Sequence, residues 1–334
     1  MAPIATENPT LAFGMEFELL VRPVGQRLEE VKRYEDWTEQ DVETNGNFDK
    51  HMNRSTIRKA LTDSLNDQGL PAELSEVFSR EDRWAIASEE LPERTYEFYW
   101  GIEIKSPVMR SDDWLHRLDK LFDAICLGGW EIQPGGCSTH IHVSPDQGTR
   151  FTWEQLREIT KAVYLFDKAI TEIMPPQRKY TPFACPITTI HPPELPNLYR
   201  NIADNSWAPL FKQIDKDMKD ILRFGLQINR HMSWNFCNVD RGIKTMEFRR
   251  PPGSGNAHEA KVWAGLALGF ISAALLGHCT AFDSWKSHPS VDDLKAFVND
   301  GLQTLGGHCA FVDVNQLVAI PDEVRIPAAS NTAT

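Results

Sequence analysis

The chain has 334 residues, of which 41 % are hydrophobic and 25 % charged, as in an ordinary globular protein. The formal net charge of −12 argues against nucleic acid and an anionic membrane as partners, because the overall field would repel both. We see no signal-peptide pattern, and the six scattered cysteines lack C-x-x-C spacing. We therefore expect a cytoplasmic protein with reduced thiols.

The first predicted strand is FGMEFELLV, residues 13–21, which carries two glutamates in an apolar run. Because side chains alternate between the faces of a strand, Glu16 and Glu18 share one face and the apolar residues at odd positions share the other. Two carboxylates this close repel each other unless positive charge lies between them. Alone, the pattern equally suits a surface strand with a solvated face, so the other strands must decide.

Caps and breakers mark the elements that follow. A charged surface insertion is predicted at 27–54, followed by a helix with Ser55 as its candidate N-cap. A second helix follows Ser111, and a third opens with the capping-box pair Thr152 and Gln155 and runs to a Pro-Pro breaker. In chain order we predict helix 55–69, strands 83–88 and 96–107, helix 112–129, strand 138–144 and helix 152–174.

The C-terminal half starts with a proline-rich segment, 181–198, which we predict to be an irregular lid or binding loop. The segment NVDRGI is typical of a hairpin connection between two strands. The longest apolar run, 262–277, is too short for a membrane span and is predicted to be part of a buried core helix. The predicted elements are helix 209–225, strands 231–237 and 244–250, helices 257–280 and 290–302, and a disordered tail at 321–334.

Hairpins and long helices both connect the predicted strands, and the strands alternate in polarity. This combination predicts one α+β domain over residues 1–320, with an antiparallel sheet and helices on one of its faces.

The alternation of the first strand recurs in four others. In chain order, the second faces of these four strands carry Glu103 and Lys105; His140, His142 and Ser144; Asn235; and Glu247 and Arg249. A merely solvated face usually mixes Lys, Thr, Ser and Gln, whereas carboxylates and imidazoles are metal ligands. The pattern favours a divalent-cation site on this face over simple hydration.

Other chemistries lack their motifs. The sequence has no P-loop, no dinucleotide-binding glycine pattern, no G-x-S-x-G elbow and no paired Cys/His zinc motif. The four isolated histidines are expected to be core or surface residues: His116, His191, His278 and His308.

Five segments, FGMEFELL, GIEIKSP, CSTHIHVS, PPQRK and MEFRRPPGS, occur in the order expected of the amidoligase family, which the chain resembles over about residues 12–275. The family resembles glutamine synthetase and glutamate–cysteine ligase in fold, which implies an active site on a concave sheet face. The resemblance implies an ATP-dependent carboxylate–amine ligase that uses two or three Mg²⁺ ions, which Mn²⁺ can replace. Its substrates would be a small carboxylate and an amine.

The resemblance also implies roles for individual residues. The metal ligands would be Glu16, Glu18, Glu103, His140 and Glu247. The residues at the ATP phosphates or the acyl phosphate would be His142, Arg178 and Arg249. Substrate or nucleotide contacts would come from Lys105, Ser144 and Asn235.

Two departures from the family pattern bear on the site. Ser138 stands where the family commonly has Gly, and Lys105 stands where an apolar residue is usual. Lys105 would either hold a substrate carboxylate or balance the charge of Glu103 or Glu16, and Asn235 would have either a catalytic or a structural role.

Two further functions use the same side chains. A metal-dependent hydrolase would activate water with them and need no ATP. A non-catalytic protein would bind ATP and Mg²⁺ without turnover. The sequence leaves the acid, the amine and the oligomeric state open.

Overall fold

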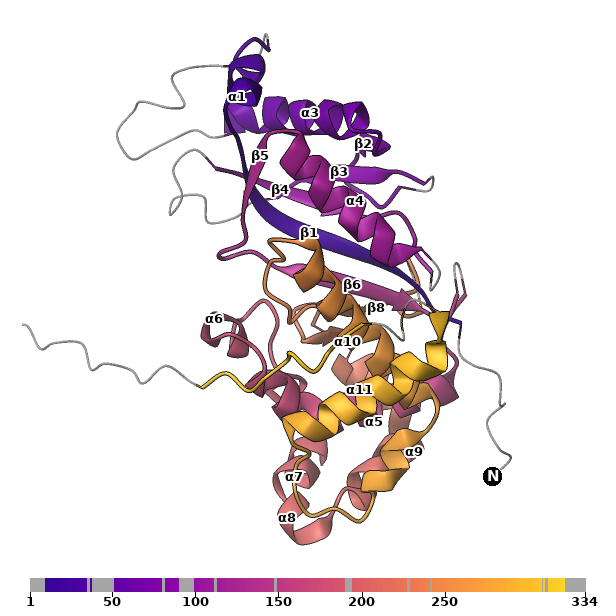
Figure 1. Cartoon of the computed structure of the whole chain (residues 1–334). Helices are drawn as coiled ribbons and strands as arrows, with labels where there is room; N and C mark the ends of the chain where they lie inside the picture. Colours follow the sequence, from indigo (N-terminus) through magenta and orange to yellow (C-terminus); the bar gives the residue numbers. More distant parts are fainter. Residues whose placement is uncertain are drawn as a thin grey trace, which may run out of the picture.

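The computed structural model describes residues 10–34, 37, 51–79, 82–89, 99–110, 113–146, 149–189, 194–226, 229–240, 242–307, 309 and 312–321. Within these ranges, eight strands form one open sheet in the order β2-β3-β4-β1-β6-β8-β7, with β5 paired to β1 (Figure 1). The strands are β1 (Ala12–Pro23), β2 (Ala72–Leu74), β3 (Trp84–Ser88), β4 (Trp100–Lys105), β5 (Trp130–Gln133), β6 (Thr139–Ser144), β7 (Trp234–Asn235) and β8 (Met246–Phe248). The expected antiparallel sheet is confirmed, except that β2 and β3 are parallel.

β1 organises the sheet, because it pairs antiparallel with β4, β5 and β6. The register places Glu16 between Lys105 on β4 and His140 on β6. On the far side of β6, His142 lies opposite Glu247 on β8. The polar residues of four strands are therefore cross-strand neighbours on one face.

Helices cover the other face of the sheet. In Figure 1, α3, α4 and α10 cross the sheet on the side toward the viewer. Phe13 of β1 packs edge-on against Trp114 of α4, and Trp234 stacks between Phe248 of β8 and Phe270 of α10. The helices are α1 (Gln26–Val31), α3 (His51–Asp67), α4 (Trp114–Leu127), α5 (Trp153–Glu172), α6 (Pro176–Lys179), α7 (Glu194–Arg200), α8 (Ile202–Asn205), α9 (Ala208–Ile221), α10 (Ala257–Leu275) and α11 (Val291–Leu305).

The predicted helix caps have different outcomes. Thr152 and Gln155 form the expected capping box at the start of α5. Ser55 is not an N-cap, because α3 begins one turn earlier, at His51, inside the predicted insertion. The charged residues before Ser55 lack an apolar period, yet they continue the same helix. Ser111 lies outside the described residues.

The proline-rich segment 181–198 is more regular than predicted. It contains a 3₁₀ turn at Ile187–Thr189 and the start of α7. Pro196 falls in the first turn of α7, where a missing backbone N–H costs no helical hydrogen bond. The predicted strands 96–107 and 231–237 are longer than β4 and β7, and the short elements β2, β5, α6 and α8 were not predicted.

Much of the predicted insertion at 27–54 and the predicted disordered tail, apart from Pro321, lie outside the described residues. The core helix is confirmed: α10 is buried along almost its whole length. Among the described helices, none combines the length and apolarity needed to cross a membrane. The six cysteines are free, as expected.

The crossing of α10 and α11 depends on two glycines. A Cβ added to Gly301 would lie 1.9 Å from the Gly269 carbonyl oxygen and 2.8 Å from the Ala273 nitrogen. These are backbone atoms, so the overlap can be relieved only by moving a helix.

We expect Gly301→Ala to lower the free energy of unfolding by about 1–3 kcal/mol, because it separates the two helices. Asp300→Ala, on the exposed side of the same helix, is the matched control and should change it by no more than about 0.5 kcal/mol. Urea denaturation measures both, and equal stability of the two variants would contradict the tight crossing.

Candidate active site

The polar faces of β1, β6 and β8 converge on one cluster of charged side chains. A Glu16 carboxylate oxygen lies 3.3 Å from both His140 Nδ1 and His142 Nε2. Glu247 approaches the same two imidazoles, at 3.5 Å and 3.7 Å. Glu18 lies at the edge of the cluster, with Oε1 3.6 Å from His140 Nε2. The alternation of the strands thus brings the predicted residues together.

Two groups of three side chains place donor atoms close enough to share a metal ion. The first triad is Glu16, His142 and Glu247, and the second triad is Glu16, Glu103 and His140. In each triad, one donor atom per residue lies within 4.8 Å of the others. Each triad draws its ligands from three strands, so the hydrogen-bonded sheet holds the donors in place. Carboxylate oxygens with an imidazole suit Mg²⁺ or Mn²⁺.

His142 has the environment of a metal ligand. Its Nδ1 lies 3.1 Å from the Thr245 hydroxyl oxygen, so a proton kept on Nδ1 and donated there leaves Nε2 able to bind a cation. Nε2 is buried and has no hydrogen-bond partner among the described residues, although it faces the carboxylates of Glu16 and Glu247. Burial opposes the charged form of His142, but Glu16 and Glu247 outweigh it and raise the pKa of His142, so without a metal a proton on Nε2 faces these carboxylates. A cation held in the first triad would take the place of that proton. The residues present therefore fit a divalent metal.

Ionisation in the cluster is governed by charge pairing against burial. Burial opposes the ionisation of Glu16 and Glu247, but His142 and His140 outweigh it and hold the pKa of both carboxyls below the ordinary value. Burial and the neighbouring Glu16 raise the pKa of Glu103 to about 7. The Lys105 ammonium beside Glu103 acts in the opposite direction but does not outweigh burial and Glu16.

Lys105 supplies positive charge on the β4 side of the cluster, where Glu103 lies. Its Nζ lies 2.9 Å from Glu103 Oε2 and 3.9 Å from Glu16 Oε1, and it donates a 2.8 Å hydrogen bond to the Glu76 carbonyl. Burial opposes its charge, but Glu103 and Glu16 outweigh burial and raise the pKa of the ammonium. Of the two roles expected for Lys105, these contacts favour charge balance over a substrate carboxylate.

The arginines differ in what they contact. Arg249 pairs with Glu247, two residues earlier on the same face, as the alternation predicts. Arg178 donates to the carbonyls of Arg249 and Arg250 at 2.6 Å and 3.1 Å, and burial lowers its pKa to about 10. Arg250 is fully buried and donates to the Lys179 carbonyl, so it lies apart from the cluster. Arg178 therefore positions the end of β8, and its contact with phosphate stays a prediction.

The two weaker candidates have local partners. Asn235 donates a 2.6 Å hydrogen bond to Glu247 Oε2, and its Oδ1 accepts from the backbone two residues on, which supports the structural role. The Ser144 hydroxyl lies within hydrogen-bonding distance of the carbonyls of Ala12 and Asp146, at the end of β6. Both contacts are with backbone carbonyls and not with a side chain of either triad.

Two residues at the site were not predicted. Thr245 lies two positions before Glu247, so the alternation that identified the glutamate also points to Thr245. Phe78 lies between β2 and β3, and its ring packs edge-on against His142 at 5.1 Å between centroids. A Cβ on Gly14 would lie 3.0 Å from that ring, so the glycine lets the ring lie against β1. No periodicity in the sequence points to Phe78.

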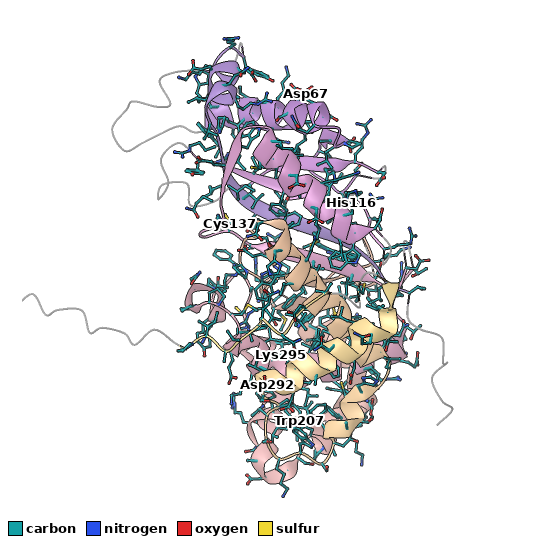
Figure 2. The ribbon with its side chains drawn as sticks, viewed as in Figure 1. Asp67, His116, Cys137, Trp207, Asp292 and Lys295 are labelled. Carbon is teal, nitrogen blue, oxygen red and sulfur yellow. The ribbon has the colours of Figure 1, made fainter. Side chains whose placement is uncertain are left out.

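His116 and Cys137 belong to neither triad. Figure 2 shows His116 on α4, where it is exposed, as expected for an isolated histidine. Cys137 is buried in the loop before β6, and burial raises the pKa of its thiol to about 12, so it is unsuited to be a nucleophile (Figure 2).

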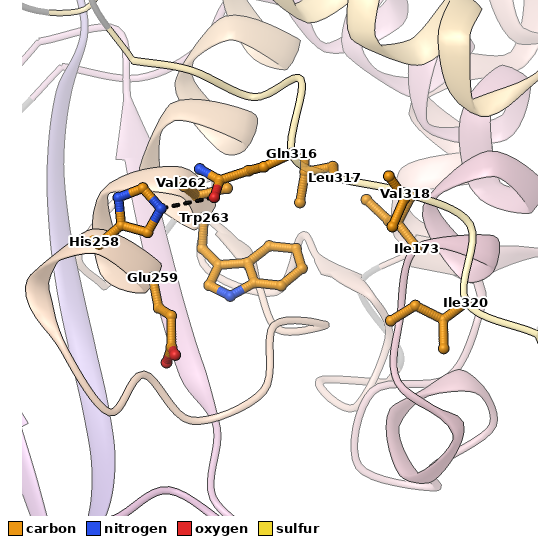
Figure 3. Close-up of a pocket in the computed structure, with 9 residues that line it drawn as sticks. All are labelled: Ile173, His258, Glu259, Val262, Trp263, Gln316, Leu317, Val318 and Ile320. Carbon is orange, nitrogen blue, oxygen red and sulfur yellow. Dashed lines mark hydrogen bonds between the residues drawn. The ribbon is translucent and has the colours of Figure 1, made fainter.

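A cavity of about 220 Å³ lies between α10 and the C-terminal segment (Figure 3). His258 and Gln316 form a 2.7 Å hydrogen bond at its edge, and Trp263 lies in its wall. None of the predicted site residues lines this cavity, so it does not compete with the triads as the active site.

We expect Mn²⁺ at about 100 times its Kd to stabilise the wild-type chain by about 2.7 kcal/mol, through binding to the folded state alone. In a chain of this size, that raises Tm by about 4 °C. Glu247→Gln removes a charged ligand of the first triad and should lose most of the increase. Glu172→Gln, which changes a half-buried residue of α5 outside both triads, should keep it. Differential scanning calorimetry with and without Mn²⁺ checks this, and an undiminished increase in Glu247→Gln would contradict the site.

A comparison with protein families agrees with the geometry. A family model described as "putative amidoligase enzyme" matches residues 9–271, and no curated protein matches the chain. The match spans most of the chain and contains both triads, Lys105 and the arginines of the site. The chain therefore belongs to the amidoligase family.

Proposed function

We propose that the protein is an ATP-dependent carboxylate–amine ligase that forms an amide through an acyl phosphate. The observation that carries the proposal is the first triad: Glu16, His142 and Glu247 meet on one buried face, with Arg249 beside them. In a member of the amidoligase family, such a group suits a nucleotide bound with divalent cations. Mg²⁺ is the cation we propose, with Mn²⁺ as a substitute.

The reaction sets the demands on the site. A carboxylate is a poor electrophile, so the γ-phosphoryl group of ATP is first transferred to it, which gives an acyl phosphate and ADP. The amine then attacks the acyl carbon, and phosphate leaves. Both steps develop charge on oxygens, so catalysis is mainly positioning and charge neutralisation.

The chain's residues divide this work. We propose that the glutamates of the cluster and His140 hold the divalent cations. When bound, Mg²⁺ neutralises phosphate oxygens and orients the nucleotide. Arg249, beside Glu247, would place a guanidinium near the transferred phosphoryl group. Arg178 would act beside it, and His142 would serve as a ligand rather than as a separate phosphate contact.

Several wider expectations remain part of the proposal. A concave active-site face like that of glutamine synthetase is proposed on the family resemblance. A single domain over 1–320 is proposed on the pattern of predicted elements, and a cytoplasmic location on the scattered cysteines and the missing signal-peptide pattern. The substrates are proposed to be a small carboxylate and an amine. The hydrolase and the non-catalytic ATP-binding alternatives use the same ligands, and membership of the amidoligase family favours the ligase over both.

The first test is ATP turnover. We expect the purified chain with Mg²⁺, ATP and pooled amino acids and amines to release ADP in a pool-dependent way. Mass spectrometry should find a product one water lighter than acid plus amine. Product that forms without ATP would instead indicate a hydrolase, and ATP binding without turnover would favour the binding protein.

We expect Glu247→Gln to lower this turnover by about 10²–10³-fold or more, because it removes charge where the phosphoryl group is neutralised. Asn235 can still hydrogen-bond the amide, so the fold should persist, with an unchanged far-UV circular dichroism spectrum. Glu172→Gln is the control and should retain wild-type turnover. Wild-type turnover in Glu247→Gln would refute the assignment of this residue.

A further inference from the structure

Lys105 differs from Arg249 because its ammonium lies near both carboxylates of one proposed metal triad. Two residues of the second triad, Glu103 and Glu16, lie 2.9 Å and 3.9 Å from its ammonium nitrogen. A divalent cation held by the second triad would have to bind the same two carboxylates. The ammonium and such a cation therefore compete for one position.

The ammonium is held in place from outside the triad as well. It donates to the Glu76 carbonyl at 2.8 Å, and it lies over the Phe78 ring, 6.0 Å from the centroid. Only 11 % of its side chain is exposed. β4 fixes the backbone of Lys105 opposite Glu16 of β1. Moving the ammonium aside would break the contact with Glu76 and leave a buried charge to find new partners.

Electrostatics makes joint occupancy unfavourable. Metal–oxygen distances of about 2.0–2.6 Å would bring a divalent ion bound by Glu103 close to the ammonium that contacts the same carboxylate. The two positive charges would repel strongly in this poorly solvated position. In the first triad, Arg249 pairs with Glu247 and not with Glu16. His140 contacts both carboxylates of that triad, but an imidazole that loses its proton is itself a metal ligand, whereas the lysine ammonium is a fixed competing charge.

We propose that Lys105 is a built-in cation that takes the place of one divalent ion, so that the chain binds metal at the first triad and not at the second. The inference rests on the proposed function for the identity of the site, and it refines the number of ions. Of the two or three cations that the family resemblance implies, Lys105 replaces the one that Glu103 would bind. In this chain, Glu103 binds the lysine.

The test counts bound ions rather than activity. Mn²⁺ alone would be titrated into the wild-type chain and into Lys105→Met, and free Mn²⁺ would be followed by electron paramagnetic resonance. We expect Lys105→Met to bind one more Mn²⁺ per chain than the wild type. The double variant Lys105→Met/Glu103→Gln should return to the wild-type number, because the additional site needs the Glu103 carboxylate.

Two further variants keep the result interpretable. Lys105→Gln is made in parallel, so that a folding failure of the methionine variant leaves a second protein in which the ammonium is absent. Lys261→Met removes a lysine that pairs with Asp119, away from both triads, and should leave the count unchanged. An equal Mn²⁺ count in the wild type and the folded Lys105 variants would overturn the proposal.

The same Mn²⁺ counts, together with ATP turnover, distinguish a failure of the proposed ligase function from a failure of the inference about Lys105. If the wild type bound no Mn²⁺ while a Lys105 variant bound one, the metal-dependent ligase would fail and the role of Lys105 would stand. If the wild type bound Mn²⁺ and turned over ATP but the variants gained no ion, the ligase would stand and the inference about Lys105 would fail.

Discussion

The structure depends on neutralising a concentration of negative charge on a buried sheet face. Four glutamates gather around two imidazoles from β6, and their side chains are largely buried. The glutamates are Glu16, Glu18, Glu103 and Glu247. Burial penalises each carboxylate, so each needs a positive partner. The histidines and Arg249 serve one side of the face and Lys105 the other. Every role proposed for these residues follows from this division.

The division is possible because β1 lies at the centre of the sheet. It pairs with β4 on one side and β6 on the other, so Glu16 belongs to both triads. A charged residue shared by two groups couples them: what binds at one changes the field at the other. Gly14, on the same strand, lets Phe78 cover His142, so the strand also shapes what overlies the metal ligands.

Hydrogen bonds donated by side chains at its edge hold the charged face in its geometry. Arg178 links α6 to the residues that follow β8, and Asn235 of β7 orients the Glu247 carboxylate. Both residues thus act on the position of their neighbours. β7 and β8 have only two and three residues, so few backbone hydrogen bonds join them. The side-chain hydrogen bonds add to these and hold the site residues in position.

The sequence by itself determined which residues share a face. The period of two along β1, β4, β6 and β8 is a local property, so the convergence of Glu16, Glu103, His140, His142 and Glu247 was predictable, and Thr245 could have been found the same way. Helix α5 was also predictable, because a capping box is local. The start of α3, the short strands β2 and β5 and the helix in the proline-rich segment were not, since packing and pairing decide marginal elements. Only the tertiary structure decided that Lys105 binds Glu103 rather than facing an open pocket, and that Phe78 lies over His142. Both depend on the segment between β2 and β3, whose position follows from contacts distant in the sequence and not from any pattern within it.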